Sequence, residues 1–369
     1  MATSELRGAE IFAGDLVRGL SRSTEDQMVA ILRGSAGPAA QFDAPWAALG
    51  GNGSSLPGLR MHLGALRGLR TLVRRWRPDV IQAHGGEPLK YAVAATRAAP
   101  RVPVVYRRIG AAPRRLARRI PRAAYGALIR RASRVIAVAE AVRQETVDTF
   151  RVSPLRVVTI PNGVDPRRMM PTKSREEIRR ALGIASRSGV LVSLGALTWE
   201  KDPLAHLDVS TRVARERSDV VHLVIGGGPM LQSVQTAIDE RGLRGRVLLV
   251  GPRRDVPDLL AAGDVLVFAS RSDGMEGMPA SVIEAGMAGL PVAAYSVAGV
   301  SEVVADQQTG LLVKPGDVAG LARGAAALLG DPRRRRRMAA AARARCGELF
   351  DIQRIAPRYL EIYREVAGE

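Results

Sequence analysis

Cysteine is nearly absent from this sequence, since Cys346 is the only one among 369 residues. A single cysteine excludes a disulfide within the chain and a metal site built from several thiolates, and it is typical of a reducing compartment. The sequence also contains no run of ~18 uninterrupted apolar residues, about the length that a membrane-spanning helix needs. We therefore expect a cytoplasmic protein whose association with a membrane, if any, is peripheral.

Lysine and aromatic residues are also scarce, whereas arginine is abundant. Only four of the 55 basic residues are lysine, and Phe, Trp and Tyr together make up 4% of the chain. The net charge is +19, of which residues 1–165 carry +14 and residues 166–369 carry +5. Because single-stranded nucleic acid is usually bound by aromatic stacking beside basic groups, the scarcity of aromatic residues argues against a nucleic-acid partner.

The arginines concentrate between residues 107 and 134, a stretch with ten arginines and no acidic residue. Such a cluster predicts a surface that binds anionic phosphates, either on an acceptor molecule or on an anionic membrane. The alternative is a solvated basic face in an arginine-rich protein. The candidate residues of this acceptor or membrane patch are Arg108, Arg114, Arg115, Arg118 and Arg119.

The length and the periodicity of the chain predict its architecture. A chain of 369 residues exceeds the ~250–300 residues at which one hydrophobic core usually divides into two. Short apolar runs alternate with segments of helical periodicity, which indicates parallel, doubly wound sheets whose ligands lie beyond the carboxyl ends of the strands. Residues 34–57 are expected to form a loop, and the expected strands include 27–32, 79–83, 102–106, 135–138, 190–194, 220–225, 247–250, 264–269 and 290–295.

The most informative stretch is residues 272–304, SDGMEGMPASVIEAGMAGLPVAAYSVAGVSEVV. Pro279 predicts the first turn of a helix over residues 280–288, which Gly289 ends. Glu276 lies before this helix and Glu284 lies within it. The backbone N–H groups at such a helix start favour an anion, whereas a carboxylate one to two turns further on can accept hydrogen bonds from a sugar diol.

The residues around these two glutamates resemble a known signature. EGMPASVIE, in which seven residues separate Glu276 from Glu284, is followed by EAGMAGLPV and AGVSEVV. Together they resemble the donor site of family 4 retaining glycosyltransferases, which have the GT-B fold of two Rossmann-like domains with a cleft between them. The resemblance implies that Glu284 holds the ribose of a nucleotide-sugar and that Glu276 approaches the transferred sugar as a catalytic residue. It also implies that the backbone near Gly277 and Met278 binds the diphosphate.

Other segments resemble the same family. Lys201 corresponds to the lysine that binds the donor diphosphate, and Gly195 begins the loop that carries it. Gly8 falls in a loop that approaches the donor phosphates, and Gly251 ends a strand near the nucleobase. The string IPNGVDPRRM at 160–169 is similar to the family's interdomain crossing, about which closure of the domains is expected to assemble the site.

Two departures from the family pattern bear on catalysis. Many members carry a histidine just after the strand equivalent to 102–106, pointing at the reacting sugar, whereas this sequence has Arg-Arg-Ile at 107–109. His84 is the candidate that partly substitutes for it; the alternative is a histidine at a strand end that bonds only to backbone. Ala196 also replaces an arginine that is common in the family.

The predicted domains are an amino-terminal domain at 1–162, a donor domain at 163–348 and a terminal helix at 349–369 that crosses back. In a doubly wound domain, a central strand feeds the glycine-rich loop, yet here that loop begins at Ala2. We therefore expect the first strand of the amino-terminal domain to be missing from the sequence and to lie upstream of Met1. The alternative is a short form in which another segment fills its place.

These features predict a retaining hexosyltransferase that moves a sugar from a nucleotide-sugar to an acceptor hydroxyl. The expected context is cell-surface polysaccharide, glycolipid or natural-product glycosylation, with a lipid-linked, saccharide or small-molecule acceptor. The sequence has no Asp-x-Asp, so a divalent metal clamp of that type is not expected, and no cofactor is expected besides the nucleotide-sugar co-substrate. The alternatives are a nucleotide-sugar epimerase or a phosphorylase on the same fold, and an inactive basic relative that binds membranes or nucleic acid.

Overall fold

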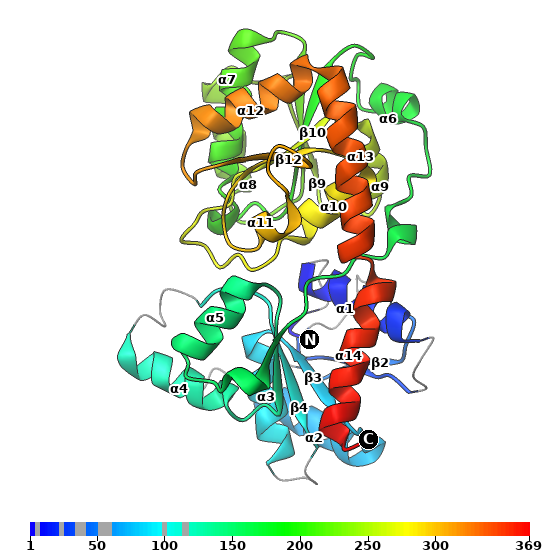
Figure 1. Cartoon of the computed structure of the whole chain (residues 1–369), viewed down its shortest axis with the longest axis vertical. Coiled ribbons are helices and arrows are strands. Elements are labelled where there is room, and N and C mark those ends of the chain that lie inside the picture. Colours follow the sequence, from blue (N-terminus) through cyan, green and yellow to red (C-terminus); the bar gives the residue numbers. More distant parts are fainter. Residues whose placement is uncertain (4–7, 22–25, 34–41, 51–60, 98–101, 113–117) are drawn as a thin grey trace. The chain divides into compact units, whose positions relative to one another are not determined.

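A computed structural model describes residues 1–3, 8–21, 26–33, 42–50, 61–97, 102–112 and 118–369. The chain divides into two compact units (Figure 1). Unit 1 comprises Met1–Gly163 and Ile352–Glu369, and unit 2 comprises Val164–Asp351. Both are α/β units with parallel sheets, as the alternating sequence pattern predicts.

Unit 2 is built on six parallel strands in the order β12-β11-β10-β7-β8-β9. Its first strand, β7, lies between β8 and β10, so the chain winds outward on one side of β7 and then returns to wind outward on the other. This reversal defines a crevice at the carboxyl ends of β7 and β10. The strands are β7 Gly189–Leu194, β8 Val220–Ile225, β9 Val247–Gly251, β10 Val265–Phe268, β11 Val292–Tyr295 and β12 Gly310–Val313.

The helices of unit 2 cover the two faces of this sheet. Helix α7 packs against α8 and α12, and α10 packs against α9 and α13 (Figure 1). Helix α6 begins with the predicted capping box, in which the side chains of Ser174 and Glu177 each bond the other's backbone N–H. The helices are α6 Arg175–Ala181, α7 Pro203–Glu216, α8 Leu231–Glu240, α9 Val256–Ala262, α10 Ala280–Ala288, α11 Val300–Val303, α12 Val318–Gly330 and α13 Pro332–Leu349.

Two stacked histidines form a buried polar network between β8 and α7. His222 bonds Ser193 through Nε2 at 2.8 Å and Ser210 through Nδ1 at 2.5 Å, and its ring lies 6.4 Å from that of His206. Burial lowers the pKa of His222 to about 3 and the pKa of His206 to about 4, so both rings are neutral at pH 7. The neutral His206 Nε2 accepts a hydrogen bond from the Ala269 backbone N–H at 2.9 Å, which fixes the end of β10.

We expect these histidines to make the stability of unit 2 depend on pH. The ordinary histidine pKa is 6.5, and the folded values are about 4 and about 3, so below pH 6.5 the unfolded chain binds protons that the folded chain rejects. The stabilisation is therefore complete above pH 6.5 and falls as the pH drops toward the folded pKa values. The loss is at most ~1.4 kcal/mol per pH unit for each histidine. The unfolding temperature should accordingly be lower at pH 5 than at pH 7.5, as calorimetry can measure.

The double variant H206Q/H222Q is the control, because glutamine keeps a polar side chain but does not titrate. Its unfolding temperature should be lower than that of the wild type at pH 7.5 and should change less between pH 7.5 and pH 5. An equal change in both proteins would show that these two histidines do not carry the effect.

Unit 1 contains a parallel sheet in the order β3-β4-β5-β6 and a separate parallel pair, β1-β2. The strands are β1 Val29–Ile31, β2 Trp46–Ala48, β3 Ile81–His84, β4 Val104–Arg108, β5 Arg134–Ala137 and β6 Val157–Thr159. The helices are α1 Gly8–Leu20, α2 Leu63–Trp76, α3 Gly86–Thr96, α4 Arg119–Ile129, α5 Glu140–Asp148 and α14 Ile352–Ala367.

The terminal helix α14 is part of the core of unit 1. Phe12 and Leu16 of α1 pack with Ile355 and Tyr359 of α14 over Ile136 of the sheet, and Figure 1 shows the two helices beside each other. Helix α14 is amphipathic and buries one apolar stripe, whereas α1 is buried over most of its surface. In the part of the chain that the structure describes, no helix is long and apolar enough to cross a membrane.

The beginning of the chain follows the edge of β1. The Met1 amino group donates to Ala30 O at 2.6 Å, and the N–H of Leu32 donates to Met1 O at 3.0 Å. The N–H of Arg33 donates to Ala2 O at 3.1 Å. This is the pattern of a parallel ladder, but in the described residues no strand joins β1 to β3.

Candidate functional site

The candidate site lies in unit 2, where the loops after β7 and β10 meet. The two strands are hydrogen-bonded neighbours, and the strand order reverses between them. Their loops therefore leave the same edge of the sheet at the position where open α/β sheets bind ligands. One loop runs from Gly195 through the short 3-10 helix η4, Trp199–Lys201, and the other runs from Ala269 to Pro279, the N-cap of α10.

Lys201 and Glu276 bridge these two loops. Lys201 Nζ lies 2.5 Å from Glu276 Oε2, which also accepts a hydrogen bond from Ser270 Oγ at 3.1 Å. The ammonium group lies 5.2 Å from the centre of the Phe268 ring. The side chains are 29% and 14% exposed, respectively, so both can meet a ligand. The structure thus brings the predicted diphosphate lysine and the predicted catalytic glutamate together, although 75 positions separate them.

Glycines set the backbone of this site by close contact. At Gly226, where φ is +140°, a Cβ would lie 1.8 Å from Gly195 O, so the loops after β8 and β7 touch backbone to backbone. At Gly299, where φ is +74°, a Cβ would lie 1.8 Å from Gly277 O. Gly299 therefore holds the segment of Gly277 and the buried Met278 against the start of α11. A larger residue at either position would displace a loop of the site.

Helix α10 presents its N-terminus and a buried carboxylate to the site. The N-cap Pro279 makes no side-chain hydrogen bond to the first turn, in which the N–H of Val282 donates to Pro279 O at 3.2 Å. The N–H groups that open a helix have no carbonyl one turn earlier to bond, so they are available to an anion. Glu284 lies in the second turn, is 6% exposed, and its Oε1 lies 2.8 Å from Arg168 Nη2. Arg168 belongs to the 3-10 helix η3, Pro166–Met169. Sequence reasoning identified Glu284 and missed Arg168, because no local spacing links residues 116 positions apart.

Two further residues that sequence reasoning missed support the site from the core. His206 holds the N–H of Ala269, and the next residue, Ser270, holds Glu276. The histidine network of unit 2 is therefore connected to the carboxylate through two hydrogen bonds, made by the consecutive residues Ala269 and Ser270 just after β10. The only sequence signal for His206 was its rarity, since the chain has four histidines.

Gly8, predicted to lie near the donor phosphates, and Gly251, predicted to lie near the nucleobase, have different surroundings. Gly251 ends β9 with φ of +70°, and its carbonyl accepts from the N–H of Gly226 at 2.9 Å, so it lies at the same sheet edge as Gly195. Gly8 is the first residue of α1 in unit 1, and a Cβ there would meet no atom of the described residues within 4 Å. Contacts with the described residues thus do not require glycine at position 8. The roles of both residues toward a nucleotide stay predictions.

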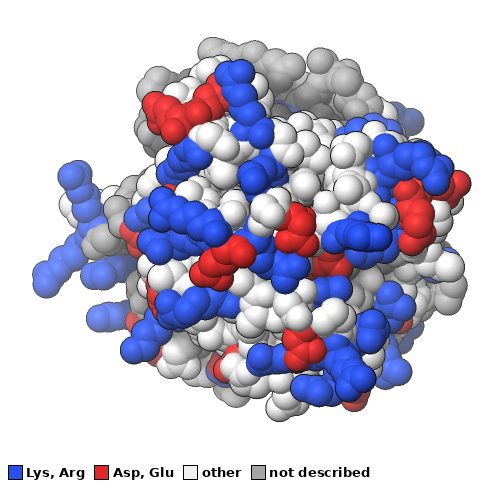
Figure 2. Space-filling model, turned by 90° about the horizontal axis from the view of Figure 1, so that it is seen from above, with Lys and Arg blue, Asp and Glu red and all other residues white. Residues whose placement is uncertain are grey.

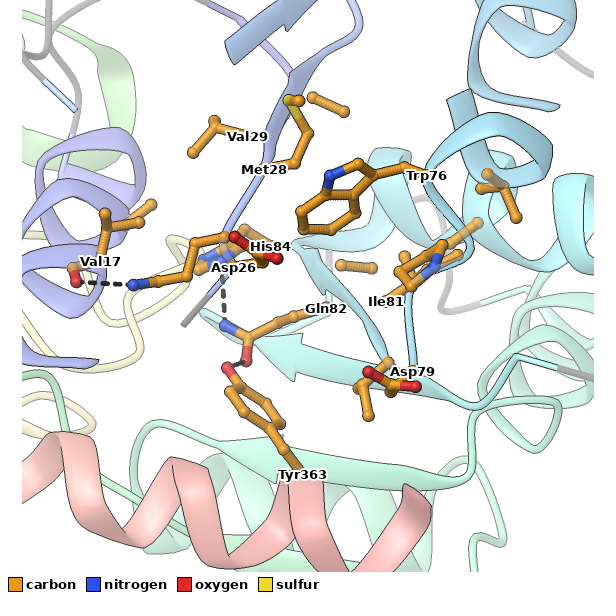
Figure 3. Close-up of a pocket in the computed structure, with 18 of the residues that line it drawn as sticks. Val17, Asp26, Met28, Val29, Trp76, Asp79, Ile81, Gln82, His84 and Tyr363 are labelled. Atoms are coloured by element: carbon orange, nitrogen blue, oxygen red, sulfur yellow. Dashed lines mark hydrogen bonds between the residues drawn. The ribbon is translucent and has the colours of Figure 1, made fainter. Parts of the chain in front are cut away.

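His84, the second predicted catalytic residue, ends β3 and faces an interior cavity of unit 1 (Figure 3). Its Nε2 lies 2.9 Å from Gln82 Nε2, so it accepts and the proton lies on Nδ1. Burial and, after it, the charge of Arg107 lower the pKa of His84 well below its ordinary value. Gln82 in turn accepts from the Tyr363 hydroxyl of α14. His84 is thus a neutral ring held by side chains rather than by backbone, and its catalytic role stays a prediction.

The structure corrects the placement of Arg108 in a surface patch. Arg108 is 2% exposed, forms an ion pair with Glu145 and donates to Thr146 Oγ1 at 2.6 Å. Arg107 is also buried, lying over the Phe12 ring at 3.7 Å and donating to Asn162. Both belong to β4, where alternate side chains enter the two helical layers. Arg108 is therefore a structural residue of the interior and is unavailable to an acceptor or a membrane.

The rest of the predicted patch is divided. Arg118 and Arg119 are exposed at the start of α4, beside Ile120, which is 84% exposed. Arg114 and Arg115 lie outside the described residues. On the face drawn in Figure 2, Lys and Arg are interspersed with Asp and Glu. This face therefore carries no continuous basic patch. Within the described residues, no group of three or more His, Cys, Asp or Glu is placed to hold a metal ion.

Comparisons with known proteins identify the family. Residues 6–168 match the family model described as Glycosyltransferase Family 4, and residues 174–345 match that of Glycosyl transferases group 1. The 2-deoxystreptamine N-acetyl-D-glucosaminyltransferase of Streptomyces fradiae is 30% identical over 365 residues, which cover 88% of this chain and 83% of the relative. The 2-deoxystreptamine glucosyltransferase of Streptomyces kanamyceticus is 28% identical, covering 85% and 87%. The chain belongs to glycosyltransferase family 4, as the sequence motifs predict.

Solved structures confirm the fold. The Anabaena protein HepE in complex with UDP-glucose matches with a TM-score of 0.85 at 22% identity, covering 99% of this chain and 98% of that chain. WaaG, a glycosyltransferase involved in lipopolysaccharide biosynthesis, matches with a TM-score of 0.76 at 16% identity, covering 97% and 96%. The predicted GT-B fold with two Rossmann-like domains is therefore confirmed.

The geometry of the site predicts large losses of glycosyl transfer in two variants. Lys201→Ala removes the cation that pairs with Glu276 in the loop before α10, and Glu284→Gln removes the charge that pairs with Arg168. Each should lower turnover by about 100-fold or more, the usual effect of deleting one electrostatic contact from an active site. The measurement is the steady-state rate of nucleoside diphosphate release.

The matched controls are exposed residues of the same types, Lys173→Ala and Glu240→Gln, which should leave the rate near that of the wild type. The unfolding temperature of each variant is to be recorded alongside. Wild-type turnover in Lys201→Ala or Glu284→Gln would exclude the corresponding residue from the site, and a loss matched by the controls would point to a general defect in folding.

Proposed function

We propose that the protein transfers a hexosyl group from a nucleoside diphosphate sugar to a hydroxyl group of its acceptor, with retention at the anomeric carbon and without a divalent metal. The observation that carries this proposal is the Lys201–Glu276 pair, which joins the loops after β7 and β10 beside the start of α10. Family membership supports the reaction class, and the strand reversal supports the position of the donor.

The charges of the site suit a diphosphate leaving group. As the bond from the sugar to the diphosphate breaks, negative charge grows on the diphosphate oxygens, and the nearby positive groups stabilise it. Lys201 supplies a full charge, and the α10 N-terminus supplies a partial charge and N–H donors. An ammonium group has three donors, so Lys201 can bond a phosphate oxygen and still hold Glu276. These groups supply the stabilisation for which other transferases use a metal.

The two carboxylates take the neutral, hydroxyl-bearing parts of the donor. Glu284 is oriented by Arg168, and a carboxylate has about four acceptor positions, so it can also accept from the two ribose hydroxyls. Glu276 is held by Lys201 and Ser270 and accepts from hydroxyls of the transferred sugar. The Arg168 contact offsets the cost of burying the Glu284 carboxylate.

We further propose a small hydroxyl-bearing acceptor of the kind named in the relatives. Two relatives, which cover 88% and 85% of this chain, are named as transferases acting on 2-deoxystreptamine. Another relative, from Escherichia coli, is named as a galactosyltransferase acting on a diphosphoundecaprenol-linked sugar, but at 27% identity it matches only 50% of this chain and 48% of its own length. The full-length matches therefore favour natural-product glycosylation over a lipid-linked acceptor.

The test is a panel of UDP-, GDP- and dTDP-hexoses, each incubated with 2-deoxystreptamine, with a lipid-linked sugar or without acceptor. We expect nucleoside diphosphate release that depends on both a donor and the aminocyclitol. Proton NMR of the product should show the same anomeric configuration as the donor. Release only with the lipid-linked sugar would overturn the acceptor proposal, and an inverted product would overturn retention.

The same panel separates the alternative activities. An epimerase would convert the sugar without releasing the nucleoside diphosphate, and it would need titratable groups placed for acid and base chemistry on the sugar ring. An inactive relative would give neither product. Either outcome would overturn the proposed transfer, because neither includes the acceptor-dependent release of nucleoside diphosphate that the transfer requires.

A peripheral position at an anionic membrane is a second proposal, favoured by one surface feature. Arg118 and Arg119 immediately precede Ile120, which is 84% exposed, at the start of α4. The segment combines two cations with an apolar side chain that a bilayer interface can accept. Flotation with vesicles containing anionic lipid should show binding at low salt that is lost as salt rises. Each arginine near the surface should contribute about 1 kcal/mol to the binding free energy.

The variant R118S/R119S should float less than the wild type, whereas the control R336S/R337S, which removes two exposed arginines from α13, should float as well as the wild type. Equal loss in both variants would mean that net charge alone attracts the protein, and no flotation of the wild type at low salt would refute the membrane proposal.

A further inference from the structure

Charged side chains crowd the two loops that form the candidate donor site. The loop after β7 carries one cation and two carboxylates, and the loop after β10 carries the same number of each before α10 begins. In chain order these residues are Glu200, Lys201, Asp202, Arg271, Asp273 and Glu276. Because carboxylates outnumber cations and opposite charges attract at any nearby position, the pairs that form depend on geometry.

Arg271 contacts two of these carboxylates. Its Nε donates to Asp273 Oδ1 at 3.0 Å, and its Nη1 donates to Asp202 Oδ2 at 3.4 Å. A guanidinium group has five N–H donors in a fixed, planar fork, so it can hold two carboxylates at once. Lys201 pairs with Glu276 at 2.5 Å. Arg271 therefore neutralises the carboxylate that follows Lys201 in the chain and leaves the ammonium group to Glu276.

Arg271 also joins the two loops beside Lys201. Its backbone N–H donates to Glu200 O at 2.9 Å, and its guanidinium lies 4.5 Å from the centre of the Trp199 ring, where the face of the ring attracts a cation. At Gly274, a Cβ would lie 3.2 Å from Glu200 Cβ, so the loops are in close contact there. These contacts hold Arg271 against the residues that precede Lys201.

The backbone of Asp202 limits which residue can replace it in an experiment. Asp202 has φ of +46°, in the left-handed region, and its side chain accepts a hydrogen bond from the N–H of Ala205 as the N-cap of α7. Asparagine tolerates this conformation and caps helices about as well as aspartate. Asp202→Asn therefore removes the charge that faces Arg271 and keeps the local structure, which separates the electrostatic role of Arg271 from its packing role.

We propose that Arg271 is a positioning residue of the donor site. By neutralising Asp202 and Asp273, it keeps Lys201 paired with Glu276 and leaves the remaining N–H donors of the ammonium group to the donor diphosphate. Without Arg271, one cation would face four carboxylates, which would compete for Lys201 and repel a diphosphate. The inference rests on the proposed function, because that function supplies the diphosphate ligand.

The first experiment measures nucleotide binding by isothermal titration calorimetry with UDP, GDP and dTDP. Arg271→Gln should weaken binding of the nucleotide that the wild type prefers by at least about 10-fold, the usual effect of losing one hydrogen bond to a charged group. The triple variant R271Q/D202N/D273N should recover binding to within about 3-fold of the wild type, because the competing charges are gone. The control Arg244→Gln, which breaks an exposed pair with Asp239, should bind like the wild type.

Recovery in the triple variant is the decisive comparison. If Arg271 acted only by packing against Trp199 and Glu200, removing two carboxylates would not restore binding. Unchanged binding in R271Q, or an equal loss in R271Q and in the triple variant, would therefore overturn the proposal.

A second measurement needs no nucleotide, so a failure of this inference can be distinguished from a failure of the proposed function. The chain has four lysines, so mass spectrometry can follow acetylation of Lys201 by acetic anhydride separately from that of Lys173 and Lys314. The ammonium form does not acylate, and nearby carboxylates stabilise it, so Lys201 in R271Q should react at least about 3-fold more slowly than in the triple variant. Lys173 and Lys314 should react equally in both.

The acetylation rates decide the inference even if no nucleotide binds to the wild type. Equal rates at Lys201 in R271Q and in the triple variant would overturn the role of Arg271. A slower rate in R271Q together with no binding of any nucleotide would support that role and would count against the proposed function.

Discussion

The candidate donor site depends on one ion pair between two loops of unit 2. Lys201 and Glu276 leave the sheet on different loops, and the 2.5 Å contact between them places a cation and a carboxylate beside the start of α10. Three features make the contact geometrically possible: the neighbouring positions of β7 and β10, the reversal of strand order between them, and the glycines that let adjacent loops touch. The pair is partly exposed, so its value lies in position more than in stability.

Neutral groups deep in unit 2 hold these charges in place. The stacked histidines stay uncharged because burial disfavours the imidazolium form. The neutral ring of His206 can therefore accept the hydrogen bond from the Ala269 N–H, whereas an imidazolium has no acceptor nitrogen. Ser270, the next residue, donates a hydrogen bond to Glu276 and so fixes that carboxylate relative to the end of β10. Arg168 holds Glu284 by an ion pair, which offsets the cost of burying that carboxylate and fixes its orientation. The acidic residues of the site are thus each held by a partner from another element.

The sequence predicted the parts that depend on local pattern. The strand before residue 269 and the helix over 280–288 follow from an apolar run and from Pro and Gly at fixed positions, and the structure has them. The strand β2 was missed because Trp46–Ala48 has three residues, too few to show alternation. Arg108 was misplaced because a run of arginines suggests a surface, whereas a β-strand sends alternate side chains into opposite layers. Arg168 and His206 required contacts between distant segments, which no local pattern reveals.

The central claim is that the donor binds where the loops after β7 and β10 meet α10. Amide hydrogen exchange with and without a saturating UDP-sugar tests it most directly, because protection reports the segments that the ligand orders. The account predicts slower exchange in residues 195–201 and 277–284, with smaller changes in the remaining strands of unit 2. Protection confined to unit 1, or no protection in these two segments under conditions where the nucleotide-sugar is turned over, would contradict it.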